Sequence, residues 1–337
     1  MRTFPFYERM SMKNHVLSDI YHKARNAAQK IYFPDAEDIR TLSAAHYISN
    51  HALATPVLIG NTHAIHALID SHPFDFVPEI IDPGTSELTS QYAEILCERM
   101  RKKNISYEEA YNLVIQPLYW AGIALYRGDC DGCVAGSLSS TGDVLRAALH
   151  TVGLAEGVKT VSSWFLMLFD DKVYGYADCG VVPYPTSEQL TDIAFSTAAN
   201  FQKVTGMEPR IAFLSFSTHG SARHESVEKV QTAYRLFSTM YPGIIADGEL
   251  QFDAAIVPAI AHRKAPNSPI AGEANIFIFP NLDAGNIAYK MSERLGGAQA
   301  IGPLIQGLNK PYCDLSRGCS VQDIVDVAAI TALMSLQ

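Results

Sequence analysis

The residues best suited to chemistry lie near the end of the chain, in the segment Cys313-Asp-Leu-Ser-Arg-Gly-Cys-Ser-Val-Gln-Asp-Ile324. Ser316 supplies a hydroxyl and Arg317 a forked guanidinium just before an apolar helix, whose first N–H groups attract anions. Ser320 and Asp323 have the S-x-x-D spacing of a capping box, so spacing alone favours Asp323 as a helix cap over a reactive carboxylate. This segment therefore predicts an anion-binding site.

A second segment, Gly136-Ser-Leu-Ser-Ser-Thr-Gly-Asp-Val-Leu-Arg146, follows an expected strand and is crowded with hydroxyl groups. Its Ser140 and Thr141 are suited to a phosphate-binding turn before a helix, but in isolation an ordinary Ser/Thr-rich helix cap explains them better. Arg146 favours the anion-binding interpretation. The basic segment 99–103 is, by itself, typical of a solvated helix end.

The elements that must position these residues alternate along the chain. Short β-rich runs followed by longer helical periods predict an α/β fold with a mostly parallel sheet. The clearest strands are expected at 56–60, 132–136, 211–215 and 275–279, and the clearest helices at 86–104, 106–126, 186–204, 221–239 and 320–335. Two apolar runs at 161–169 and 172–179 predict an antiparallel hairpin at a domain boundary. We expect ligands to bind in a cleft between the two halves.

Composition narrows the function further. The 337 residues are 48% hydrophobic and 18% charged, which favours a folded chain, and the net charge of −9 argues against nucleic acid or an anionic membrane surface as a partner. The longest apolar runs are too short to span a bilayer, and charges at Glu8 and Arg9 interrupt any secretory signal, so we expect a cytoplasmic protein.

Several familiar motifs are missing. The sequence has no G-x-G-x-x-G, no G-x-x-x-x-G-K-[ST] and no G-x-S-x-G, so dinucleotide-binding, P-loop and α/β-hydrolase interpretations lose their main support. Cys130 and Cys133 have no second pair or nearby histidine to complete a zinc set, and His219 and His224 are spaced wrongly for one helical face. We expect no metal site.

Five stretches together resemble the phosphate acetyltransferases of the phosphate acetyl/butyryl transferase group, over most of the chain. They are 56–61, 214–222, 247–255, the run from Ala271 to Lys290, and 314–320. The resemblance implies an isocitrate/isopropylmalate dehydrogenase-like fold with two α/β domains and an interdomain cleft. The first domain would comprise 1–156 plus 304–337, and the second, 157–303, would carry much of a homodimer interface.

The implied reaction is the reversible conversion of acetyl-CoA and phosphate to acetyl phosphate and CoA, by direct attack in a ternary complex. CoA is then a substrate, and no tightly bound cofactor is expected. By the same resemblance, Ser316 would bind the oxyanion, Arg317 the phosphoryl group, and Asp323 would be the general base. The substrate-binding residues would be Arg146, Arg101, Ser140, Thr141 and Lys290.

Rival interpretations remain open. A phosphate butyryltransferase would differ chiefly in the pocket around the acyl chain. A non-catalytic domain that senses acetyl-CoA or acetyl phosphate is disfavoured by the intact set of Ser316, Arg317 and Asp323. A dehydrogenase of the related fold would normally need a metal-binding group of carboxylates, which the sequence does not offer. The chain departs from the family pattern at Ser139, Ala147, His219 and Cys313.

Overall fold

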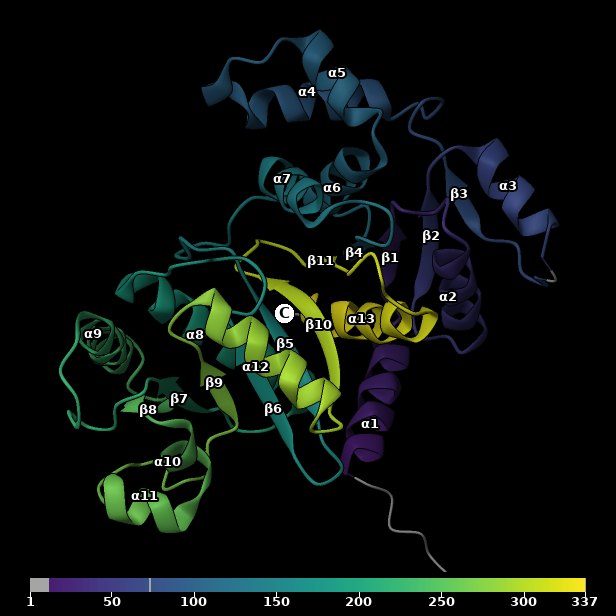
Figure 1. Ribbon diagram of the computed structural model, residues 1–337. Coiled ribbons are helices and arrows are strands. Elements are labelled where there is room, and N and C mark those ends of the chain that lie inside the picture. The colour runs from purple at the N-terminus through teal and green to yellow at the C-terminus, as the bar shows by residue number, and fades with distance from the viewer. Residues whose placement is uncertain (1–11, 73, 337) are drawn as a thin grey trace, which may run out of the picture.

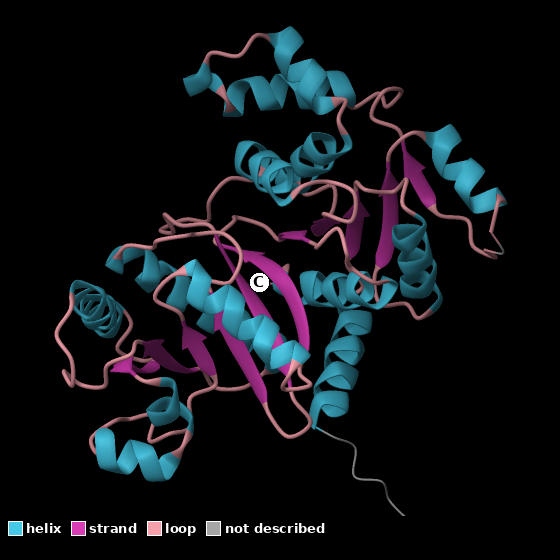
Figure 2. Ribbon diagram, viewed as in Figure 1, coloured by secondary structure: helices cyan, strands magenta, loops and turns pink. Residues whose placement is uncertain are grey.

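A computed structural model describes residues 12–72 and 74–336, in which the strands form two sheets (Figures 1 and 2). The first sheet is parallel, with the order β11-β4-β1-β2-β3. Its strands are β1 (Lys30–Phe33), β2 (Thr55–Ile59), β3 (Glu79–Ile81), β4 (Gly132–Ala135) and β11 (Tyr312–Asp314). The last of these comes from the far end of the chain and pairs with β4, which places the segment after residue 314 beside the turn after residue 135.

The second sheet is mixed, with the order β10-β5-β6-β9-β7-β8. Its strands are β5 (Ser162–Leu168), β6 (Val173–Ala177), β7 (Arg210–Leu214), β8 (Ile245–Leu250), β9 (Ile276–Ile278) and β10 (Gln299–Gln306). The expected hairpin is confirmed, because β5 pairs antiparallel with both β6 and β10, while β6, β9, β7 and β8 run parallel.

Alternating side chains divide each sheet between two cores. In β1, Ile31 and Phe33 face a core shared with α2 (Ile39–Asn50) and α13 (Val321–Met334), while Tyr32 faces the opposite core. That opposite core is filled by α4 (Thr89–Arg99), α5 (Tyr107–Val114), α6 (Pro117–Arg127) and α7 (Thr141–Thr151). Helix α3 (Thr62–Asp70) follows β2.

The second sheet is built in the same way. Trp164 and Leu166 of β5 face α8 (Ser187–Thr205) and α9 (Glu225–Met240), whereas Phe165 and Met167 face α10 (Phe252–Ile256) and α12 (Leu282–Arg294). Helix α11 (Pro258–Lys264) follows α10. Figure 1 shows α13 between the two sheets, where it contacts α1 (Met12–Ala27), α8 and β10. Residues 324–333 of α13 are all buried, so this helix joins the two halves in one core.

The helix predicted at 186–204 and that at 320–335 are confirmed to within a residue or two, and the one predicted at 221–239 begins later, at Glu225. The two others differ more. The stretch 106–126 forms two helices rather than one, because Pro117 starts α6 and cannot continue α5. The stretch 86–104 begins later, at Thr89, and ends in the 3₁₀ turn Arg101–Lys103. In the described part of the chain, no helix combines the length and apolarity needed to cross a membrane.

Candidate active site

The loop after β11 carries Ser316 and Arg317 into a cavity of about 670 Å³, whose walls come from both halves of the chain. A turn fixes this loop: the N–H of Cys319 donates to the carbonyl of Ser316 at 2.8 Å, and the N–H of Gly318 donates to the Ser316 hydroxyl at 3.3 Å. Both Ser316 and Arg317 are exposed. The hydroxyl and the guanidinium are therefore accessible to a ligand in the cavity.

The hydroxyl-rich turn predicted from the sequence also lines this cavity. Ser139, Ser140, Thr141 and Gly142 line the same cavity as Ser316 and Arg317. Ser140 is the N-cap of α7, and its hydroxyl accepts from the N–H of Asp143 at 3.2 Å. The cap interpretation is thus confirmed, and the helix N-terminus it caps also borders the cavity, as an anion-binding turn requires.

A second cavity, of about 310 Å³, adjoins the first and holds Asp323 and Lys290. The two cavities share the wall residues Phe165, Tyr289, Pro303, Leu315 and Ser316. The rings of Phe165 and Tyr289 are stacked, with centroids 4.1 Å apart. Ser316 therefore lies between a pocket rich in hydroxyl groups and one lined by two acidic and two basic side chains, Asp323, Glu293, Lys290 and Arg294.

The capping interpretation of Asp323 is confirmed, and the same side chain faces the second cavity. Its Oδ2 accepts from the N–H of Ser320 at 2.8 Å and from the Ser320 hydroxyl at 2.9 Å, while the Ser320 hydroxyl accepts from the N–H of Asp323 at 3.2 Å. The cap engages Oδ2 and leaves Oδ1 outside it. The cap and the cavity position are compatible, since the box fixes the direction in which the carboxylate points.

Arg40 holds the Ser316–Arg317 loop in place, and sequence reasoning missed it. Its Nη1 donates to the carbonyl oxygens of Arg317 and Cys319, both at 2.8 Å. Its Nη2 donates to the carbonyl of Ser137 at 2.9 Å and to the carboxylate of Asp38 at 2.6 Å. Although burial raises the pKa of Asp38, the hydrogen bonds from Arg40 lower it below its ordinary value. One guanidinium therefore connects both loops of the site.

The two remaining predicted arginines lie outside these cavities. Arg146, on α7, is exposed and pairs with Asp143 at 2.7 Å. Arg101 is exposed in the 3₁₀ turn, whereas its neighbour Arg99 stacks on Tyr126, 3.9 Å from the ring centroid. Among the described residues, neither Arg101 nor Arg146 lines either cavity.

These arginines nevertheless border one basic patch. The Nζ of Lys103 lies 2.6 Å from Nε2 of His150, on α7 one turn beyond Arg146. Burial, followed by the positive charges of Lys103 and Arg146, lowers the pKa of His150. The 3₁₀ turn and α7 thus present positive charge together near the C-terminal end of α7, whose N-terminus borders the larger cavity.

Cys319 lines the smaller cavity but is poorly suited to attack a substrate. Its side chain is buried, and burial raises the pKa of the thiol to about 11, an effect that the nearby Arg40 charge opposes. A thiol with so high a pKa remains protonated near neutral pH, and the thiolate is the reactive form. The described residues contain no group of three His, Cys, Asp or Glu side chains placed to hold a metal ion.

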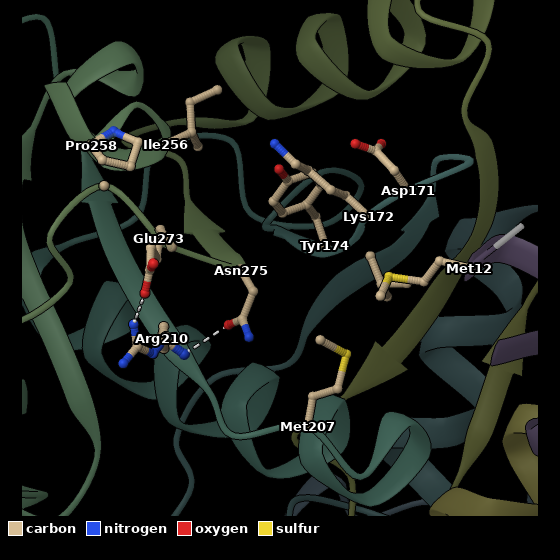
Figure 3. Close-up of a pocket in the computed structure, with 13 residues that line it drawn as sticks. Met12, Asp171, Lys172, Tyr174, Met207, Arg210, Ile256, Pro258, Glu273 and Asn275 are labelled. Atoms are coloured by element: carbon tan, nitrogen blue, oxygen red, sulfur yellow. Dashed lines mark hydrogen bonds and ion pairs between the residues drawn. The ribbon is translucent and has the colours of Figure 1, made fainter. Parts of the chain in front are cut away.

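A further cavity, of about 480 Å³, lies at the opposite edge of the second sheet, where β6, β7 and β9 begin (Figure 3). Arg210 pairs there with Glu273 at 2.7 Å, and its backbone N–H donates to the Asn275 side chain at 2.7 Å. Ligands of parallel α/β sheets bind at the carboxyl ends of the strands, so this cavity lies at the end of the sheet opposite to the usual ligand site.

Comparison with solved structures shows which known fold the chain resembles. A 4-hydroxythreonine-4-phosphate dehydrogenase from Klebsiella pneumoniae superposes with a TM-score of 0.52 at 11% identity, covering 92% of this chain and 100% of that one. At this low identity the likeness concerns the fold alone. It confirms the expected dehydrogenase-like α/β architecture with mostly parallel sheets.

Comparison by sequence and structure also identifies much nearer relatives. A phosphate acetyltransferase of Acetivibrio thermocellus is 43% identical over 325 residues, which cover 95% of this chain and 98% of that protein. A phosphotransacetylase structure from Streptococcus pyogenes has a TM-score of 0.92 at 37% identity, covering 97% and 99% of the two chains. One from Staphylococcus aureus has a TM-score of 0.90 at 40% identity, covering 96% and 99%.

The family model described as phosphate acetyl/butaryl transferase matches residues 15–332, which include both loops of the site and the carboxylate at the start of α13. The family resemblance stated from five short stretches is thereby confirmed. This chain belongs to the phosphate acetyl/butaryl transferase family.

Proposed function

We propose that this chain is an acyltransferase that moves an acetyl group reversibly between CoA and inorganic phosphate. The observation that carries the proposal is one continuous site in which Ser316 lies between the Ser139–Gly142 turn and Asp323. The names of relatives that match nearly the whole chain, phosphate acetyltransferase and phosphotransacetylase, support the same reaction.

In the direction that makes acetyl-CoA, Asp323 takes the proton from the CoA thiol, and the sulfur bonds to the carbonyl carbon of acetyl phosphate. The carbonyl oxygen becomes an oxyanion, to which Ser316 donates a hydrogen bond. Breaking the bond between that carbon and the phosphate oxygen restores the carbonyl and releases phosphate, whose charge Arg317 offsets. The reaction passes through a ternary complex, and the protonated state of Cys319 supports transfer without an enzyme thioester.

The substrate-binding roles follow from position. Ser140 and Thr141, which line the larger cavity, hold the phosphate of acetyl phosphate. Lys290 lines the smaller cavity and offsets negative charge of the substrates there. Arg146 and Arg101 lie at the basic patch outside the cavities, where they bind the anionic groups of CoA.

The larger organisation is also part of the proposal. The chain has two domains, residues 1–156 with 304–337 and residues 157–303, with the second boundary inside β10, and the enzyme acts in the cytoplasm as a homodimer. The second domain exposes an apolar stripe along α12 and its C-cap, formed by Ile287, Met291 and Leu295 at four-residue spacing. Such a stripe on a soluble protein supports a role in self-association.

The reaction is tested by following the thioester absorbance of acetyl-CoA and of butyryl-CoA, each with phosphate present or omitted. Thioester loss that requires phosphate and yields acetyl phosphate supports the proposal. A preference for butyryl-CoA would reassign the chain as a phosphate butyryltransferase, which the family description also covers. Binding of acetyl-CoA without turnover would contradict catalysis and indicate a sensing domain.

Replacing Arg317 by lysine tests the phosphoryl contact. Lysine keeps the charge and loses the fork that can donate two parallel hydrogen bonds to a phosphoryl group, so kcat/KM for acetyl phosphate should fall about 10- to 100-fold. Arg235→Lys, at an exposed position on α9, is the matched control and should leave kcat/KM unchanged. Equal kinetics of Arg317→Lys and the control would remove Arg317 from the site.

Arg40→Lys tests whether the hydrogen bonds of Arg40 hold the Ser316–Arg317 loop in place. Lysine can still pair with Asp38 but cannot reach the three carbonyl groups of Ser137, Arg317 and Cys319 together. We expect kcat to fall about 100-fold through loss of orientation, with a smaller change in KM. Steady-state kinetics of the variant and of wild type give kcat and KM, and thermal unfolding checks that both proteins are folded to the same extent at the assay temperature. Wild-type kcat in a folded variant would show that the loop keeps its shape without these hydrogen bonds.

A further inference from the structure

Two buried carboxyl groups lie beneath the loops of the site, and they are held in opposite ways. Asp35 is fully bonded: its Oδ2 accepts from the N–H of Gly136 at 2.7 Å, of Leu138 at 3.1 Å and of Ser139 at 3.2 Å. Its Oδ1 accepts from the Ser139 hydroxyl at 2.5 Å. Four donors satisfy a carboxylate, so Asp35 is suited to carry its negative charge while it shapes the turn.

Asp314 has no such donors. It ends β11 opposite Ala135, its side chain is 0% exposed, and both of its oxygen atoms lack a hydrogen-bond partner among the described residues. The space around it is tight: a Cβ on Gly136, whose φ is +105°, would lie 2.3 Å from Oδ1 of Asp314 and 2.5 Å from the nitrogen of Leu315. The carboxyl group thus fills the contact between the two loops.

A buried carboxylate without partners is costly, and the surroundings of Asp314 favour its neutral form. Burial raises its pKa to about 7, and the negative charge of Asp35 acts in the same direction. The nearby Thr141 hydroxyl and Leu315 N–H act against it, although neither is in hydrogen-bond geometry with the carboxyl group. Cys313, the neighbour on its own strand, has its pKa raised to about 11, chiefly by burial, and is neutral. Asp35 is therefore the nearby negative charge that disfavours ionisation of Asp314.

We propose that Asp314, in its neutral form, is a positioning residue for phosphate binding. It joins the Gly136–Thr141 turn to the Leu315–Arg317 loop, and by staying uncharged it keeps a second negative charge from the residues next to the phosphate pocket. When Asp314 loses its proton, repulsion from Asp35 loosens that contact, and the buried charge repels the anion in the neighbouring pocket. This inference rests on the proposed function, because it assigns phosphate to the cavity lined by Thr141 and Ser316.

The sign of the stability effect follows from the raised pKa. Between the ordinary carboxyl pKa of about 4 and about 7, the folded chain holds a proton on Asp314 that the unfolded chain has lost. The free energy of unfolding therefore falls as the pH rises through this window. Replacing Asp314 by a side chain of the same shape that cannot ionise should abolish this fall in the free energy of unfolding.

The test is Asp314→Asn, which preserves the shape of the neutral acid. At pH 6 the KM for phosphate of the variant should lie within about 2-fold of wild type. By pH 8 the wild-type KM should exceed that of the variant about 10-fold, since the neutral fraction of Asp314 falls about 10-fold per pH unit above the pKa. Phosphate itself titrates in this range, so the ratio of the two KM values at each pH is the readout, from which the ionisation of phosphate cancels.

Two further measurements keep the proposal testable. The melting temperature of Asp314→Asn relative to wild type should rise between pH 5 and pH 8, an effect that does not require activity. If the variant does not fold, calorimetry of wild type with sulfate, an anion that does not titrate here, in buffers of different ionisation heat at pH 7.5 should show uptake of up to one proton.

The contrary outcomes are specific. A KM ratio that stays constant from pH 6 to pH 8, or sulfate binding without proton uptake, would overturn the role of Asp314. Failure of the wild-type chain to form acetyl phosphate is a separate result, which would contradict the proposed function itself.

Discussion

Replacing Asp323 by asparagine should lower kcat about 10²- to 10⁴-fold, the range expected when a general base is lost. Asparagine occupies the same volume and can still accept a hydrogen bond from Ser320, so the first turn of α13 remains capped. What disappears is the capacity to take the proton of the CoA thiol. Steady-state rates with acetyl phosphate and CoA, measured across pH, report this loss directly.

The matched control is Ser320→Ala, which removes the other half of the same capping box. Its effect should be on stability, about 1 kcal/mol, with kcat within a few-fold of wild type. If the two variants lost stability and activity in the same proportion, Asp323 would be a cap alone. A base role requires that Asp323→Asn lose far more activity than its stability explains.

Ser316→Ala should lower kcat about 10²- to 10³-fold, the usual cost of removing one oxyanion donor. The contact forms fully only in the transition state, so the KM for each substrate should change much less than kcat. The loop itself should survive, because the Cys319 N–H donates to the backbone carbonyl of Ser316 and Arg40 holds the neighbouring carbonyls. Initial rates at saturating substrate, compared with KM values, separate the two effects.

Ser238→Ala, on α9 and in neither cavity, controls for the loss of a serine hydroxyl. It removes a hydrogen bond to the carbonyl of Tyr234 and should leave kcat unchanged. An unchanged kcat in Ser316→Ala as well would exclude the hydroxyl from the reaction. A rise in KM with constant kcat would instead assign Ser316 to binding.

Local sequence signals predicted the parts of the site that are local in the chain. The residues of the Ser316–Arg317 loop and of the Ser140–Thr141 turn each lie within a few positions of a helix start, where capping and anion binding have sequence signatures. Strand alternation similarly explains the observed strands. Pro117 explains why the stretch 106–126, expected as one helix, is broken into two.

The residues that hold these loops together carried no local signal. Arg40 reaches Ser137 and Arg317 across 97 and 277 positions of sequence, and Asp35 reaches Ser139 across 104. Asp314 stands within the recognised motif, but its lack of hydrogen bonds depends on how closely β4 and β11 approach. Such roles emerge only when tertiary contacts are known.

The pairing of β11 with β4, and the place of α13 in the core, bear on how the protein is made. While a ribosome is still translating the middle of the chain, the nascent first sheet lacks its last strand and the helix that covers it. Domains generally fold as units during synthesis, so this one must wait for the final residues before it can close. A product truncated before residue 312 would expose the apolar edge of β4 and become a substrate for chaperones and proteases.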